Sequence, residues 1–180
     1  KLKGSASNID GLTEKVTITS GCGQGTMFGN LTEDIGKFKL NSSLKIKQSV
    51  LLTIIDEVRR FSSIYKQAGS VHGCALFKGP KMLFYCEDVG RHNAVDAVAG
   101  KMWENQLDGR DLVFYTTGRL TSEMVIKGAQ MHIPVLLSRS GVTQMGVEMA
   151  RNVDMTLLGR CSGKHFDYII NFLRFSDNPI

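Results

Sequence analysis

The sequence predicts an α/β domain built on a mostly parallel sheet with helices on both faces. Three observations predict this fold class. Strand-like and helix-like segments alternate from residue 92 onward, two of these strands are continuous apolar runs, and an apolar pair of strands around a Gly-Pro turn precedes them. With 180 residues, 42% apolar and 22% charged, the chain has the size and composition of one ordinary globular domain.

A glycine-rich segment precedes this domain. Apolar residues are sparse in it and five glycines interrupt any periodicity, so we expect loop with one short strand at 15–19. We therefore divide the chain into an N-terminal segment, 1–43, and an α/β domain, 44–180. Because Lys1 is not an initiator methionine, we also expect further sequence to precede it.

Within the domain, each element follows from its hydrophobic pattern. Residues 44–68 carry an apolar residue every three or four positions, which predicts one long amphipathic helix. Two apolar runs, 72–77 and 82–89, flank Gly79-Pro80 and predict an antiparallel hairpin. The tail, 164–180, fits a strand, a helix, or one followed by the other. The remaining segments are predicted as helices at 92–103, 121–132 and 143–152, and as strands at 111–117, 134–138 and 155–160.

Composition and cysteine spacing exclude several classes of protein. No apolar run approaches the roughly 18 residues of a membrane-spanning helix, and no N-terminal stretch has the order of a signal peptide, so we expect a cytoplasmic protein. The net charge of +5 is scattered over the chain, which gives nucleic-acid binding little support. The four cysteines form neither a C-x-x-C pair nor a zinc-spaced cluster with histidine, so no metal site is predicted.

The turns after the predicted strands carry the strongest functional signal. Ligands of open parallel sheets bind beyond the carboxyl ends of the strands. Here three turns each combine an arginine with a glycine, and the helix that follows presents free N–H groups. These features predict a site for phosphate or pyrophosphate at one edge of the sheet. The candidate residues are Asp88, Gly90, Arg91, Asn93, Thr117, Gly118, Arg119, Ser122, Ser138, Arg139 and Ser140.

A plainer interpretation of these turns stays open. Turns from strand to helix need glycine, serine and a capping residue for structural reasons alone, and their arginines can be solvated or pair with Asp88 or Glu123. In the first turn, His92 and Asp96 lie one helical turn apart, a spacing at which aspartate can fix a histidine tautomer or a proton path. Local hydrogen bonds at the start of a helix are the alternative explanation.

The four cysteines have different sequence surroundings, which predict different roles for their thiols. Cys74 and Cys86 lie among apolar residues of the predicted hairpin, where cysteine is most often a small buried side chain. Cys161 follows Arg160 at a strand end, where either a reactive thiol or a plain turn is possible. Cys22 lies between glycines with no bulky neighbour. That setting suits a thiol that accepts and passes on sulfur, although it equally fits an exposed loop cysteine.

Four segments resemble the signatures of the FdhD/NarQ family, the formate dehydrogenase accessory sulfurtransferases. The resemblance runs from about residue 20 to about residue 168. It implies a three-layer, cytidine-deaminase-like α/β fold with a mixed sheet, an antiparallel hairpin and parallel βα crossovers. It also implies no zinc, and the chain lacks the glutamate and the cysteine pair of the deaminase zinc site. The segments are Val71-His72-Gly73-Cys74-Ala75, Asp88 to Asp96 with its G-R-H-N string, Thr117 to Met124, and Ile133 to Ser140.

The resemblance implies a function as well. The family carries sulfur from a cysteine desulfurase to a molybdenum or tungsten bis-pterin guanine dinucleotide cofactor, before that cofactor enters formate dehydrogenase. On this basis Cys22 is expected to carry the sulfur as a persulfide, and the protein is expected to be a homodimer. His72, His92 and Asp96 join the turn residues as expected contacts of the cofactor, whose pyrophosphates match the site predicted from the turns.

One departure from the family pattern affects this function. The usual sulfur loop is C-G-x-C-G, whereas this chain has Cys22-Gly23-Gln24-Gly25-Thr26. A relay between two cysteines is therefore impossible at this loop. Either Cys22 alone carries a persulfide, or the protein binds the cofactor without transferring sulfur. A cofactor-binding chaperone without persulfide chemistry is thus the alternative function, and nucleic-acid binding is a weaker third.

Overall fold

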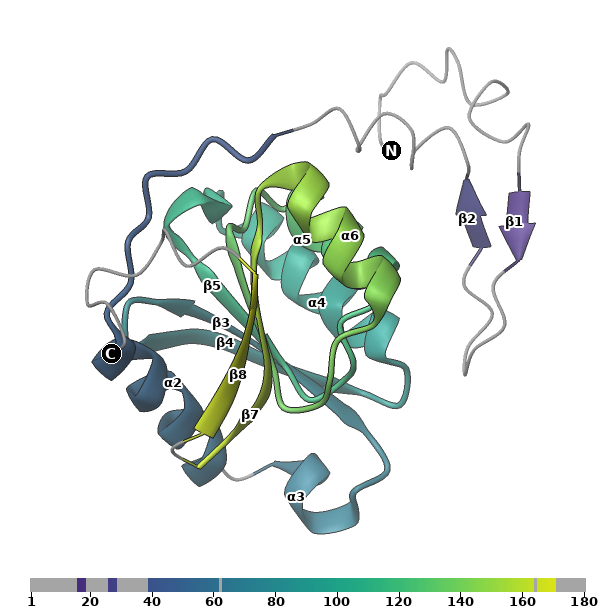
Figure 1. The fold of residues 1–180 in the computed structure, drawn as a ribbon. Helices are drawn as coiled ribbons and strands as arrows, with labels where there is room; N and C mark the ends of the chain where they lie inside the picture. The colour runs from purple at the N-terminus through teal and green to yellow at the C-terminus, as the bar shows by residue number, and fades with distance from the viewer. Residues whose placement is uncertain (1–15, 19–25, 29–38, 62, 164, 171–180) are drawn as a thin grey trace.

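A computed structural model of the chain describes residues 16–18, 26–28, 39–61, 63–163 and 165–170 (Figure 1). In the N-terminal segment, β1 (Val16–Ile18) pairs antiparallel with β2 (Thr26–Phe28). The first of these confirms the strand expected at 15–19, whereas the second was not expected from the hydrophobic pattern. Cys22, the predicted sulfur carrier, lies outside the described residues.

A six-stranded sheet between two helical layers forms the domain (Figure 1). Its spatial order is β4-β3-β5-β6-β7-β8. One face is covered by α4 (Arg91–Glu104), α5 (Ser122–Gln130) and α6 (Gln144–Val153), and the other by α2 (Gln48–Arg60). This is the predicted α/β arrangement with helices on both faces. The strands are β3 (His72–Lys78), β4 (Lys81–Asp88), β5 (Val113–Thr116), β6 (Val135–Ser138), β7 (Thr156–Ser162) and β8 (His165–Ile170).

The sheet is mixed and contains the antiparallel hairpin, which confirms what the family resemblance implies, whereas the mostly parallel sheet predicted from the alternation of strands and helices is wrong. Parallel pairing joins β5 to β6 and β6 to β7. The pairs β3–β4, β3–β5 and β7–β8 are antiparallel. The difference arises because the first strand of the hairpin, rather than the second, lies beside β5. Hydrophobic periodicity reports which face of a strand is buried and carries no information about its neighbour in the sheet.

The long helix predicted over 44–68 is also wrong, because two helices occupy this region. After α2 the backbone becomes extended at Ser63 (φ −145°, ψ 160°), and α3 (Ile64–Ala68) begins there. The Ser63 hydroxyl accepts a hydrogen bond from the Lys66 N–H at 3.3 Å and caps the second helix. The Phe61 ring packs on Tyr85, with 4.5 Å between ring centroids. The cap at Ser63 and the packing of Phe61 on Tyr85 therefore divide the region into two helices, although its apolar pattern is continuous.

The other predicted elements are confirmed with small shifts at their ends. The hairpin turns at Gly79, whose φ of +54° is a conformation that favours glycine. The segment at 111–117 forms β5 after a short 3₁₀ turn, η2 (Gly109–Asp111). The ambiguous tail contributes β8, which pairs antiparallel with β7.

The central strands are closely packed between the helical layers. β5 and β6 are completely buried, as their continuous apolar runs predict. A Cβ atom added at Gly128 of α5 would lie 3.1 Å from both Leu136 methyl carbons, so the helix lies close against β6. Phe114 and Leu136 are among the largest fully buried side chains, and truncating either to alanine should cost about 2–5 kcal/mol.

Candidate functional site

The predicted turns meet at one edge of the sheet. β4, β5 and β6 end there, and β3 begins there because it runs antiparallel to both neighbours. The register sets His72 opposite Asp88, and Thr116 beside Ser138. A bridge between Leu120 and Val142 joins the second and third turns. The residues expected to form the site therefore gather at one end of the domain.

Arg91, Gly118 and His72 come together at this edge and form what we term the Arg91 nook. A Cβ atom added at Gly118 would lie 3.3 Å from Cβ of Arg91 and 3.4 Å from Nδ1 of His72. The Nε atom of Arg91, Nδ1 of His72 and Oγ1 of Thr121 are buried and have no hydrogen-bond partner within the described ranges. Buried polar groups are normally paired, so this cluster has capacity for a partner.

Two of the three helices that start at this edge lack a side-chain cap. At α4 the N-cap residue is Gly90, and at α5 the N-cap residue Thr121 leaves its hydroxyl unbonded. By contrast, the Thr143 hydroxyl at α6 accepts a hydrogen bond from the Gly146 N–H at 3.2 Å. Uncapped helix starts keep free N–H groups and partial positive charge, which attract anions.

Asp88 shapes the first turn. Its Oδ1 atom accepts hydrogen bonds from the Gly90 N–H at 2.8 Å and from the Asn93 side-chain amide at 3.1 Å. The carboxylate is thereby bonded within the turn that leads into α4. Asp88 and Asn93 are thus bonded to each other in the turn that leads to Arg91, and their predicted role in binding stays a prediction.

His92 and Asp96 pair with residues of α5 rather than with each other. Nε2 of His92 lies 3.0 Å from Oε2 of Glu123, with the two side chains 19% and 12% exposed. The Asp96 carboxylate binds the Lys127 ammonium group at 2.5 and 2.6 Å. These two contacts join α4 to α5, and Asp96 acts on His92 through its charge, which raises the pKa of the imidazole.

Both histidines of the site are held in the neutral form. Burial, followed by the positive charge of Arg91, lowers the pKa of His72 below its usual value. Burial and Arg91 also lower the pKa of His92, although the nearby Glu123 carboxylate opposes them. Positive charge at the nook therefore comes from arginine, while the imidazoles are neutral around pH 7.

The third turn uses its hydroxyl groups within the protein. Ser138 donates to the Gly118 carbonyl at 2.7 Å, and Ser140 donates to the Thr117 carbonyl at 2.8 Å. The Thr117 hydroxyl accepts a hydrogen bond from the Gly73 N–H at 3.0 Å. Ser138 and Ser140 were expected to bind phosphate, and their hydrogens are already committed to backbone carbonyls. Ser122, the first residue of α5, has no such bond within the described residues.

The three arginines do not form one cluster. Arg91 lies in the nook, on the side of the edge covered by α4 and α5. The Arg139 guanidinium lies over the Tyr65 ring, 5.5 Å from its centroid, on the side covered by α2. Arg119 is exposed and forms no ion pair with any described residue. The expectation that the three guanidinium groups converge is therefore not met, because Arg91 alone among the three lies in the nook.

Arg139 lines a separate cavity of about 280 Å³ beneath α2 and α3. Its walls include three tyrosines and three cationic side chains, and they contain no carboxylate within the described residues. Such walls suit a planar ring on an anionic molecule. Thr117 lines this cavity and Gly118 lines the nook, so consecutive residues separate the two spaces. The key cavity residues are Tyr65, Tyr85, Tyr115, Arg59, Lys66 and Arg139.

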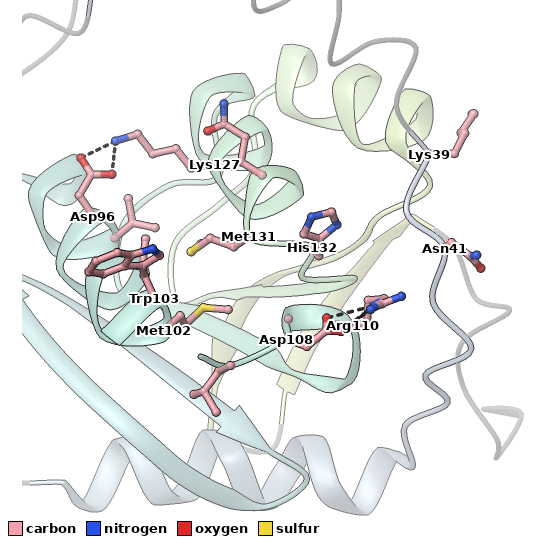
Figure 2. A pocket seen from close by; sticks show the side chains of 15 residues that line it. Lys39, Asn41, Asp96, Met102, Trp103, Asp108, Arg110, Lys127, Met131 and His132 are labelled. Carbon is pink, nitrogen blue, oxygen red and sulfur yellow. Dashed lines mark hydrogen bonds and ion pairs between the residues drawn. The ribbon is translucent and has the colours of Figure 1, made fainter. Parts of the chain in front are cut away.

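A larger groove of about 640 Å³ lies on the outer surface of α4 and α5 (Figure 2). Asp96 and Lys127 lie at its rim and Met131 in its wall, and Trp103 stands 83% exposed beside it. Of the predicted site residues, Asp96 alone belongs to this groove among those the structure describes. Asp96 and its partner Lys127 thus both line this groove.

The described cysteines are buried or half-buried and have weakly acidic thiols. Burial raises the pKa of Cys74 to about 12 and that of Cys161 to about 12. Burial also raises the pKa of the half-buried Cys86 thiol. The core assignment of Cys74 is confirmed, and the strand end around Cys161 does not activate its thiol.

Sequence reasoning missed Tyr65, Thr121 and Glu123 as site residues. Thr121 and Glu123 lie in the second turn and its helix start, so an inspection of capping residues would find them. Tyr65 comes from the predicted continuation of the long helix, and no local signal places it beside Arg139. Within the described ranges, no group of three or more metal-binding side chains occurs, and every helix is too short or too polar to cross a bilayer.

Comparison with known proteins relates these features to a family. The FdhD/NarQ family profile matches residues 2–174. A curated relative from Wolinella succinogenes, sulfur carrier protein FdhD, is 32% identical over 157 residues, which are 87% of this chain and 54% of the relative. The protein of the same name from Saccharolobus solfataricus is 36% identical over 127 residues, covering 69% of this chain and 49% of the relative.

A solved structure extends the likeness to the fold. The crystal structure of a candidate formate dehydrogenase accessory protein from Desulfotalea psychrophila superposes with a TM-score of 0.74 at 27% identity. The match covers 92% of this chain and 71% of that chain. The chain spans about half the length of the curated relatives that it matches.

Proposed function

Because the chain belongs to the FdhD/NarQ family, we propose that it is a sulfur carrier for formate dehydrogenase. Its substrate is the molybdenum bis(molybdopterin guanine dinucleotide) cofactor, and the sulfur comes from a cysteine desulfurase. The proposal includes a cytidine-deaminase-like fold, a cytoplasmic location and assembly as a homodimer. It gives the described domain the task of holding the cofactor, while Cys22 carries the sulfur.

The Arg91 nook is the observation that carries this proposal. The Arg91 Nε–H, which has no partner among the described residues, lies at the uncapped start of α4 and beside Gly118, shortly before the uncapped start of α5. Charged donors and helix N-termini together form a site for a phosphate or pyrophosphate group. A guanine dinucleotide carries such groups, and the nook is where we place them.

The tyrosine-lined cavity is where we place the rings of the ligand. Aromatic faces and the Arg139 guanidinium suit the guanine and pterin rings of the cofactor. Because Thr117 and Gly118 separate the cavity from the nook, one extended dinucleotide can reach both. In this arrangement Arg91 holds phosphate and Arg139 packs on a ring.

Cys22 is the proposed sulfur carrier because the described cysteines have raised pKa values. In the transfer, the Cys22 thiolate attacks the outer sulfur of the desulfurase persulfide. A new sulfur–sulfur bond forms on Cys22, the sulfur–sulfur bond in the desulfurase breaks, and the desulfurase cysteine leaves as a thiolate. The outer sulfur on Cys22 is then available for the bound cofactor.

Intact mass measurement tests this assignment. After incubation with a cysteine desulfurase and free cysteine, the protein should gain one sulfur atom, and the reductant dithiothreitol should remove it. Cys22→Ala should abolish the gain, whereas the matched control Cys161→Ala should leave it unchanged. Retention of the added sulfur in Cys22→Ala would overturn the proposed carrier.

The replacement of the second loop cysteine by Gly25 favours one other function. A cofactor chaperone would bind guanine nucleotides at the same edge without forming a persulfide on any cysteine. The two functions therefore separate in a single experiment. Guanosine diphosphate (GDP) binding together with no gain of sulfur would identify the chaperone.

A further inference from the structure

The carboxylate of Glu87, on β4, binds the start of α3. Its Oε2 atom accepts a hydrogen bond from the Ile64 N–H at 2.9 Å, and its Oε1 atom accepts one from the Tyr65 N–H at 2.8 Å. Such N–H groups in the first turn of a helix have no partner within the helix. The Ser63 hydroxyl already serves the Lys66 N–H from within the same turn. The two oxygens of Glu87 therefore add a connection between α3 and the edge strand of the sheet.

α3 is too short and too exposed to hold its own position (Figure 1). It has five residues, and none of their side chains is buried. A helix of this length is not stable by itself in water, so its bonds to the rest of the protein decide where it lies. Its Tyr65 is half-buried, lines the cavity and lies under the Arg139 guanidinium. The position of this wall of the cavity therefore depends on the bonds that Glu87 accepts.

Another wall residue, Tyr85, orients the Glu87 carboxylate. The two residues are two positions apart on β4, so their side chains leave the same face of the strand. The Tyr85 hydroxyl donates a hydrogen bond to Oε1 of Glu87 at 3.2 Å. Gly73 leaves room for this hydroxyl, because a Cβ atom at that position would lie 2.2 Å from it. Tyr65 and Tyr85 line the cavity and Glu87 lies behind them, so Glu87 acts on the cavity through the tyrosines.

We propose that Glu87 is a positioning residue that fixes Tyr65 in the wall of the cavity before the guanine or pterin ring of the ligand enters. This inference rests on the proposed function, because it concerns the cavity in which we place those rings. A wall that is already in position loses less conformational entropy on binding than a wall that the ligand must first order. Binding of the ring then depends on a carboxylate that does not contact the ligand.

Amide hydrogen exchange followed by NMR measures the hold on α3 before any ligand is added. The Ile64 and Tyr65 N–H groups should exchange about tenfold faster in Glu87→Gln than in the wild-type protein, because one acceptor oxygen becomes an amide nitrogen that only donates. Glu148→Gln, the same chemical change on an exposed side chain of α6, should leave both rates unchanged. Equal rates in the wild-type protein and Glu87→Gln would overturn the inference.

Two ligand probes separate a positioning role from a general effect on folding. GDP should bind Glu87→Gln about tenfold more weakly than wild type, which corresponds to the loss of about one hydrogen bond. Inorganic pyrophosphate carries no ring, so it should bind both proteins equally at the Arg91 nook. An equal loss for both probes is the result of a merely structural role and would overturn the inference.

A double-mutant cycle tests whether Glu87 acts through Tyr65. In Tyr65→Ala the wall that Glu87 positions is absent, so adding Glu87→Gln should not weaken GDP binding further. A further tenfold loss would overturn the inference. If GDP binds wild type and Glu87→Gln equally, the inference falls and the proposed function stands. If neither GDP nor pyrophosphate binds the wild-type protein, both are contradicted.

Discussion

Two turns at the same edge of the sheet have similar sequences but differ in whether their polar side chains form hydrogen bonds within the described part of the protein. The turn at 117–122 and the turn at 138–143 each contain glycine, arginine and hydroxyl side chains. In the later turn Ser138, Ser140 and Thr143 all form hydrogen bonds within the protein. In the earlier one, the Thr121 hydroxyl has no partner in the described part of the chain, and Arg91 and His72, which lie against Gly118, each have a polar atom in the same state. The later turn is a scaffold, and the earlier one has capacity for a ligand.

Composition alone does not separate a scaffold from a binding turn. What separates them is whether each donor and acceptor already has a partner. Substitutions in the two turns should therefore differ in their effects on ligand binding and on stability.

Removing the Arg91 guanidinium, which lies against Gly118 of the turn at 117–122, should have the largest effect. Arg91→Gln should weaken GDP binding about 100-fold, because charge-assisted contacts to phosphate are lost. Its free energy of unfolding should stay within about 0.5 kcal/mol of wild type, because the Nε–H that it removes has no partner. Calorimetric titration and urea unfolding measure the two quantities. Unchanged GDP affinity would show that the nook is not the phosphate site.

The scaffold turn should respond in the opposite way. Ser138→Ala removes the donor to the Gly118 carbonyl and the acceptor of the Ser140 N–H, both in a fully buried side chain. We expect the free energy of unfolding to fall by about 2 kcal/mol, as measured by urea denaturation. Ser122→Ala, the matched change in the turn at 117–122, should lower the free energy of unfolding by less than about 0.5 kcal/mol. Equal losses would remove the distinction between the turns.

A pair of glycines tests the geometry of the nook. A Cβ at Gly118 would press on Arg91 and His72, whereas a Cβ at Gly141 would meet nothing within 4 Å. Gly118→Ala should therefore weaken GDP binding about tenfold, and Gly141→Ala should leave it unchanged. Titration of the two variants side by side checks this. Identical affinities for both would place the ligand away from Gly118.

The smallest expected effect is a dependence of the free energy of unfolding on pH, which follows from the lowered pKa values of His72 and His92. The pKa values of His72 and His92 lie below the ordinary 6.5 in the folded protein, so the unfolded chain takes up protons first as the pH falls. Their contribution to stability is complete above about pH 6.5 and is lost as the pH falls through the folded pKa values. Urea unfolding from pH 7.5 to 5 should show this loss, and it should be smaller in His72→Gln/His92→Gln. An equal loss in the double variant would contradict the assignment.

Local sequence signals predicted the elements of the fold and missed the sheet order. The Gly79-Pro80 turn and the buried runs of β5 and β6 are local patterns, and the structure contains them. The placement of β3 between β4 and β5 depends on distant pairing, which periodicity does not encode. The break after α2 depends on Ser63 and on the Phe61–Tyr85 contact, which connects distant parts of the chain.

The same division holds at the candidate site. Arg91 and Gly118 were predicted because turns at strand ends collect ligand-binding residues. The internal bonds of Ser138 and the separation of Arg139 could not be predicted, because both depend on which face of the sheet each side chain occupies. Glu123 emerges as a site residue once α4 and α5 lie side by side.

A crystal structure of the protein with bound GDP would show whether the Arg91 nook holds phosphate. A phosphate group of GDP should lie within hydrogen-bond distance of Arg91 Nε and of backbone N–H groups at the starts of α4 and α5. A diphosphate bound elsewhere, such as in the groove beside Trp103, with the Arg91 nook unchanged, would contradict it.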